Sequence, residues 1–312
     1  MNIDTDKPIG PRESRGLSKR ALETRALLLA AIALFLVASA VHIAVGDYPK
    51  GIDVLPDERS YLEIARSLFT GNALIIRGVA SDFQKILYPL SLFPALLFPN
   101  GADQIRFVGV LNSLYACSTV FPAFALARKL FRKPLVVLGC MVLAIISPDL
   151  MYSMTFMTES VFMPLALWLV YLCWRCFEAQ GKRQLALSAV AGLVCYLVYL
   201  CKEVAWMFLI AFAVFFIVAT ATKRLPARRA LANVGLFAAG YFAPFVIMKL
   251  TLFSGLFNSY GQFSFDILLA PYTVLFGLYS LAVDSSYFIV GFGVFPVLFV
   301  ACTYGKLTRA ER

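Results

Sequence analysis

Long apolar stretches recur along this chain of 312 residues and constrain its fold more than any motif does. Hydrophobic residues make up 61% of the chain and its mean hydropathy is +0.79, so one soluble core could not bury them. Stretches of about 18 or more apolar residues can cross a bilayer as helices. The sequence therefore predicts an all-α polytopic membrane protein of about eight transmembrane helices, at residues 26–45, 106–127, 134–148, 158–177, 184–200, 204–221, 231–253 and 287–304.

The distribution of Lys and Arg predicts how the chain is oriented in the membrane. If the amino terminus is cytoplasmic, 20 of the 28 basic residues lie inside, as the positive-inside rule favours. We expect a basic cytoplasmic tail at 1–25 and a single membrane-embedded domain at 26–312, with outer loops at 46–105 and 254–286. The net charge of +10 then meets membrane lipids, and we expect no nucleic-acid partner.

Two apolar segments are predicted not to span. Residues 86–98 are too few to cross at 1.5 Å per residue, and two prolines interrupt their helix hydrogen bonds. Counting 265–282 as a span would put the last basic residues outside, against the charge rule. We expect both segments to be re-entrant or to lie on the outer surface.

A pair of carboxylates, Asp57 and Glu58, marks the first outer loop, in the motif PDERSYLE. Pro56 predicts the start of a short helix, since proline favours the first helical position. Its apolar face would repeat at helical spacing through Tyr61, Ile64, Ala65 and Leu68. The carboxylates would lie near unsatisfied N–H groups, which keeps them ionised and able to accept a proton; alternatively they only complement the helix dipole.

Cysteine and histidine usage excludes several chemistries. The seven cysteines lie in or at the ends of apolar stretches, where a thiol packs as a small hydrophobe, so no disulfide framework is predicted. One histidine cannot form a zinc site of the usual kind, and no Gly-rich phosphate loop indicates nucleotide hydrolysis.

Several sequence pieces follow one another in a characteristic order. After the first span come DERSYLEIARSLFTG, ILYPLSLFPALLF, RFVGVLNSLYACSTVFPAFALARKLF, MYSMTFMTESVFMPL and GLVCYLVYLCKEVAWMFL. In this order they resemble the GT-C class of integral-membrane glycosyltransferases. The chain is most similar to bacterial enzymes related to protein mannosyltransferases and to the aminoarabinose or galacturonic-acid transferases of lipid A. The resemblance covers about residues 27–248 and implies a GT-C-like bundle with juxtamembrane helices on the outer face.

The resemblance implies a glycosyltransferase of the bacterial inner membrane. Its donor would be a sugar on a polyprenyl phosphate, and its acceptor a hydroxyl of a glycan, lipid or protein on the extracytoplasmic side. The class's catalytic acid maps onto Asp57 as general base, with Glu58 beside it. A second outer acid maps onto Glu159, and the phosphate-facing cation maps onto Lys202.

Other outer residues are candidates for substrate binding. Arg77, Lys85 and Arg106 could join Lys202 in holding phosphate, and Tyr61 and Tyr88 could contact sugar. Each has a structural alternative. Lys202 could form an ion pair with its neighbour Glu203, the arginines and Lys85 could be surface charges, and the tyrosines could anchor the interface.

A metal is not required for a monophosphate leaving group, although Asp57, Glu58 and Glu159 could gather around a divalent cation. Members of the class commonly continue beyond the point where this sequence stops, so a partner could supply part of acceptor recognition. Two other hypotheses stay open: a non-catalytic or truncated scaffold, and a lipid or sugar transporter. Transport is disfavoured because no internal repeat is found and the acidic residues gather in outer loops.

Overall fold

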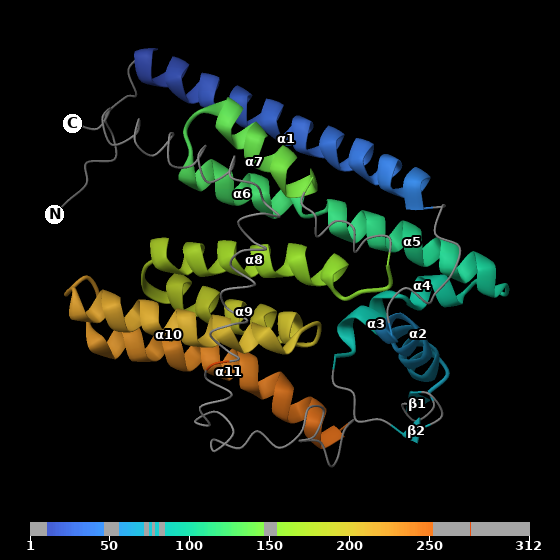
Figure 1. The fold of residues 1–312 in the computed structure, drawn as a ribbon. Coiled ribbons are helices and arrows are strands. Elements are labelled where there is room, and N and C mark those ends of the chain that lie inside the picture. Colours follow the sequence, from blue (N-terminus) through green and yellow to red (C-terminus); the bar gives the residue numbers. More distant parts are fainter. Residues whose placement is uncertain are drawn as a thin grey trace. The chain divides into compact units, whose positions relative to one another are not determined.

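The computed structural model describes residues 11–46, 56–71, 75–76, 79–80, 85–146, 155–251 and Leu275 (Figure 1). Among these residues, five helices are long and apolar enough to cross a membrane. They are Ala21–Gly46, Gly101–Leu130, Glu159–Glu178, Glu203–Ala221 and Ala227–Met248. The predicted class, an all-α polytopic membrane protein, is confirmed. The predicted last span at 287–304, and all of the predicted outer loop 254–286 except Leu275, lie outside the described residues.

The first group of packed helices is α1 (Pro11–Gly46), α5 (Gly101–Cys117), α6 (Val120–Leu130) and α7 (Pro134–Ile146). α7 has 13 residues and begins where the predicted span 134–148 begins. α1 begins inside the predicted tail 1–25, because that segment is rich in strong helix formers. The candidate span Gly101–Leu130, which contains the predicted span 106–127, consists of α5 and α6 with a turn between them at Ser118 and Thr119. Pro122 explains the break, since it cannot donate a helical hydrogen bond back to Ser118.

The second group is α8 (Glu159–Glu178), α9 (Gly181–Tyr199), the 3₁₀ helix η2 (Glu203–Ala205), α10 (Trp206–Ala221) and α11 (Ala227–Thr251). One hydrophobic core joins these helices, with Leu169, Phe216 and Phe237 fully buried at its centre. α9 fills the position of the predicted span 184–200. It is not among the five candidate spans because its first turn is polar.

Helices α9 and α11 lie side by side and approach closely (Figure 1). A Cβ atom on Gly192 would overlap the backbone carbonyl of Phe237, and one on Gly240 would overlap the carbonyl of Ala189. Within the same interface, Ser188 Oγ donates to Asn233 Oδ1 over 2.7 Å. Small residues and a buried hydrogen bond are typical of helix pairs packed in lipid.

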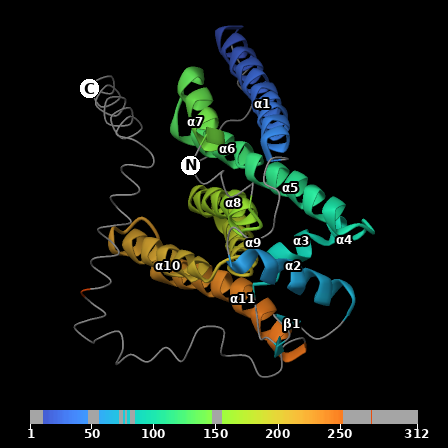
Figure 2. The ribbon, with the colours of Figure 1, turned by 45° about the vertical axis from the view of Figure 1, so that its right-hand side comes forward.

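Short elements connect the first span to α5. They are α2 (Pro56–Phe69), the two-stranded hairpin of β1 (Ile75–Ile76) and β2 (Val79–Ala80), α3 (Leu87–Ser91) and α4 (Phe93–Leu96). α2 packs against α3 and α4 (Figure 2), and its predicted apolar face is confirmed, with Ile64 and Ala65 fully buried. The segment 86–98 forms two short helices rather than one, which agrees with the predicted interruption by its prolines; its placement in or on the membrane stays a prediction.

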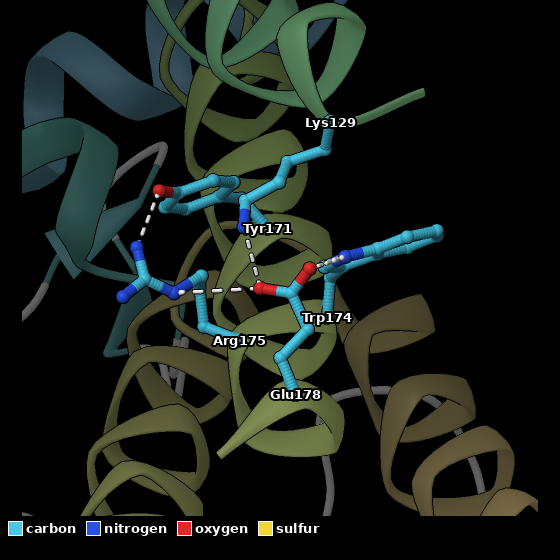
Figure 3. Close-up of polar contacts among 5 residues, drawn as sticks. All are labelled: Lys129, Tyr171, Trp174, Arg175 and Glu178. Atoms are coloured by element: carbon cyan, nitrogen blue, oxygen red, sulfur yellow. Dashed lines mark hydrogen bonds and ion pairs between the residues drawn. The ribbon is translucent and has the colours of Figure 1, made fainter. Parts of the chain in front are cut away.

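Helix α8 carries a Lys–Glu ion pair at each end. Glu159 pairs with Lys202 at its start, and Glu178 pairs with Lys129 of α6 at its end, with Nζ 2.5 Å from Oε2. Figure 3 shows Trp174 Nε1 donating to the other oxygen of Glu178 over 2.8 Å, and Arg175 beside it bonded to the Tyr171 hydroxyl. Twenty helical residues span about 30 Å, the thickness of a hydrocarbon core, so the two pairs suit the two membrane surfaces.

The glycine contact between α9 and α11 predicts that replacing glycine by alanine changes stability differently at two positions of α11. Gly240→Ala should lower the unfolding free energy by about 1–3 kcal/mol, because the new methyl group overlaps the Ala189 carbonyl. Gly235→Ala is the matched control, since a Cβ there meets nothing within 4 Å. It should leave stability unchanged or raise it by up to about 1 kcal/mol. Thermal unfolding in detergent measures both, and equal effects would contradict the close approach.

Candidate active site

Glu58 is buried although it carries a carboxylate. Its side chain is 3% exposed, and its Oε1 accepts a hydrogen bond of 2.9 Å from the backbone N–H of Phe156. Phe156 belongs to the segment that leads into α8. The contact therefore fastens the first turn of α2 to a part of the chain almost 100 residues away.

Asn112 of α5 links two further segments. Its Nδ2 donates to the carbonyl of Thr155 over 2.9 Å, and its Oδ1 accepts from the Tyr88 hydroxyl over 3.1 Å. The Tyr61 ring meets the Tyr88 ring edge-on, with centroids 5.3 Å apart. Phe156, Tyr61 and Tyr88 share one hydrophobic core, so α2, α3, α5 and the segment before α8 converge here.

Glu159 and Lys202 form the ion pair of the site. Lys202 Nζ lies 2.6 Å from Glu159 Oε1, and the Thr158 hydroxyl donates to Oε2 over 3.3 Å. The side chain of Glu159 is 12% exposed and that of Lys202 is 36% exposed. As the first residue of α8, the Glu159 carboxylate is also stabilised by the helix dipole. Lys202 Nζ lies 5.7 Å from the Phe162 ring centroid, within reach of a cation–π interaction.

Lys202 pairs with Glu159 rather than with its sequence neighbour Glu203. Glu203 lies 3.4 Å from Lys85 Nζ instead. Lys202 has an extended backbone, at φ −147° and ψ 135°, and successive side chains of an extended segment point to opposite sides. Lys85 is brought near because Leu87 N–H, at the start of α3, donates to the carbonyl of Leu200 over 3.1 Å.

The remaining predicted residues lie elsewhere or outside the described part. Arg106 is on an exposed part of α5, with NH1 3.9 Å from Asp103, and this contact does not join it to the cluster. The side chain of Asp57 and all of Arg77 lie outside the described residues. Six of the nine predicted site residues are thus brought together: Glu58, Tyr61, Lys85, Tyr88, Glu159 and Lys202.

Burial raises the pKa of two groups in this region, the Tyr88 phenol and the Cys201 thiol. It raises the pKa of the Tyr88 phenol far above its usual value; the Asn112 hydrogen bond opposes this shift, while nearby Tyr61, Glu58 and Glu159 add to it. Tyr88 therefore stays neutral and donates. Burial also raises the pKa of the Cys201 thiol to about 12. A protonated thiol is a poor nucleophile and metal ligand.

No group of three or more His, Cys, Asp or Glu residues that could hold a metal ion occurs in the described ranges. Independence from metal stays a prediction. The sequence interpretation missed Asn112, although a buried amide inside the apolar stretch VLNSLY is a signal that could have found it.

A region of the chain that contains three of the six residues of this cluster, Tyr88, Glu159 and Lys202, matches a known family. The sequence model of the dolichyl-phosphate-mannose-protein mannosyltransferase family matches residues 87–248, just over half of the chain. The chain belongs to this family. It is therefore a membrane glycosyltransferase of the GT-C type, with a lipid-linked sugar donor and an acceptor. No curated protein and no solved structure gave a match.

The family match begins at the first residue of α3, so it contains Glu159 and Lys202 but not Asp57 and Glu58. The link to the acidic pair is made by contact. Glu58, next in sequence to Asp57, is hydrogen-bonded to Phe156 inside the matched segment. The assignment of Asp57 thus depends on α2 docking against the family's core region.

A double-mutant cycle tests the partner of Lys202. Unfolding of the variants Lys202→Ala, Glu159→Ala and their combination should give a coupling energy of about 0.5–3 kcal/mol, because the two charges are in contact and partly buried. The same cycle with Glu203→Ala is the control. It should give coupling near zero, since Glu203 pairs with Lys85. Stronger coupling to Glu203 would refute the observed pairing.

Proposed function

We propose that this chain transfers a sugar from a polyprenyl-phosphate carrier to an acceptor hydroxyl on the extracytoplasmic face of a bacterial plasma membrane. Asp57 acts as the general base. Lys202 holds the donor phosphate, with Lys85 close to it. The observation that carries this proposal is the cluster in which Glu58, Glu159 and Lys202 lie at one end of α8.

The chemistry needs a base and a cation. The cluster contains the cation, Lys202, and the proposed base, Asp57, adjoins Glu58 of the cluster in the sequence. The acceptor oxygen attacks the anomeric carbon, its proton passes to the Asp57 carboxylate, and the bond from that carbon to the phosphate oxygen breaks. The phosphate leaves with the bonding electrons, so a cation must meet the developing charge. An ammonium group has three N–H donors, and Glu159 accepts from Lys202 through a single oxygen, Oε1. The other two N–H donors of Lys202 can reach a phosphate because the Lys202 side chain is partly exposed.

Asp57→Asn tests the base. The substitution keeps the size of the side chain and removes its capacity to accept the proton, so turnover should fall by about 10²-fold or more. The glycan that disappears on gene deletion identifies sugar and acceptor, and purified variants are then assayed for sugar transfer. Glu63→Gln, on the same helix and paired with Arg59, is the matched control and should retain activity. A larger loss in Glu58→Gln than in Asp57→Asn would move the role to Glu58.

Thiol labelling tests the side of the membrane. The charge distribution favours a position of the loop 46–105 outside the cytoplasm, so Ser81→Cys should react with a membrane-impermeant thiol reagent in intact cells. The parent chain is the control, because its six described cysteines are buried or half-buried. Labelling of Ser81→Cys only after lysis would overturn the proposed orientation and the site of transfer with it.

A further inference from the structure

We propose that Asn112, together with Glu58, positions the phosphate site through the backbone of Thr155 and Phe156. Neither side chain needs to touch the donor for this role. Asn112 fixes the Thr155 carbonyl and Glu58 fixes the Phe156 N–H, and these two contacts hold the segment that begins α8. The inference rests on the proposed function, because it assigns Lys202 to the donor phosphate.

The chemistry of the contacts defines how Asn112 must be oriented. A backbone carbonyl only accepts hydrogen bonds, so the amide must turn its NH2 group toward Thr155. Its oxygen then faces Tyr88, whose neutral phenol donates. Asn112 is fully buried, and both the oxygen and the nitrogen of its amide form hydrogen bonds. These bonds connect α5 to α3 and to the segment before α8.

The two contacts act close to the ion pair. Thr155 and Phe156 lie four and three residues before Glu159, and the first turn of α8 is bonded back to the Thr158 carbonyl. When the backbone of Thr155 and Phe156 is held in place, the start of α8 is held too, and with it the position of the Glu159 carboxylate. Because Glu159 is bonded to Lys202 over 2.6 Å, the position of the ammonium group follows. A displacement of about 1 Å in such a site can cost up to about 10²-fold in function.

Binding of farnesyl monophosphate to the purified chain in detergent, with thermal unfolding of the same samples, tests this role. Asn112→Leu is close in size, adds no charge and removes the hold on Thr155. We expect its affinity for the probe to fall by about tenfold or more. Tyr88→Phe keeps the bond between Asn112 and Thr155, so its effect on affinity should be smaller.

Ser188→Ala is the matched control for lost stability. It removes a buried hydrogen bond to Asn233, 14 residues before Lys202 in the chain and outside the cluster. It should lower the melting temperature while the probe binds as it does to the parent. If Asn112→Leu loses stability to a similar extent and also binds the probe as the parent does, the positioning role is refuted.

The Glu58 variants give a second, independent test, which also serves if Asn112→Leu does not fold. Glu58→Gln keeps an oxygen that can accept from Phe156 N–H, whereas Glu58→Leu does not. The glutamine variant should recover most of the affinity lost in the leucine variant, and equal affinities would overturn the inference. Lys202→Ala tests the proposed function separately. If it binds the probe as the parent does, the phosphate site is wrong, whatever the Asn112 result.

Discussion

Helices in a bilayer gain little by burying apolar surface against one another, because lipid chains are already apolar. This constraint explains how the described helices are held together. α9 and α11 meet through glycines that allow backbone contact and through the hydrogen bond from Ser188 to Asn233. α6 and α8 are joined by the ion pair of Lys129 and Glu178. Small residues and polar contacts thus add to the shared hydrophobic core in joining these helices, while the many exposed apolar side chains suit contact with lipid.

The need to pair buried polar groups shapes the candidate active site. Glu58 and Asn112 are buried polar groups, and each would destabilise the fold if left without a partner. Both find partners in the backbone just before α8. Because the segment 155–158 is not helical, its N–H and C=O groups are available for such bonds. Side chains from α2 and α5 therefore hold the non-helical segment in place. In the proposed positioning role, this also fixes the ion pair of Glu159 and Lys202 beside it.

Local features of the sequence predicted local structure well. The spacing of apolar residues after Pro56 predicted the buried face of α2, and the prolines in 86–98 predicted that helical structure is interrupted there. Tertiary partners were harder to predict. Glu203 adjoins Lys202 in sequence, yet the extended backbone at Lys202 turns the two side chains apart. The true partner, Glu159, is 43 residues away. The apolar stretch around Asn112 marks it as unusual, but its partner is the backbone carbonyl of Thr155, which no residue pattern encodes.

The pairing of Lys202 with Glu159 also suits the turnover that the proposed function requires. A bare ammonium group at the membrane edge would be costly before the donor arrives, and would hold the phosphate product tightly after transfer. The Glu159 carboxylate would reduce both effects, because it balances the charge of Lys202 in the absence of ligand. Under the proposed function, the phosphate would compete for N–H donors of Lys202 that are only partly used. Binding would be weaker than at an isolated lysine, and product release correspondingly easier.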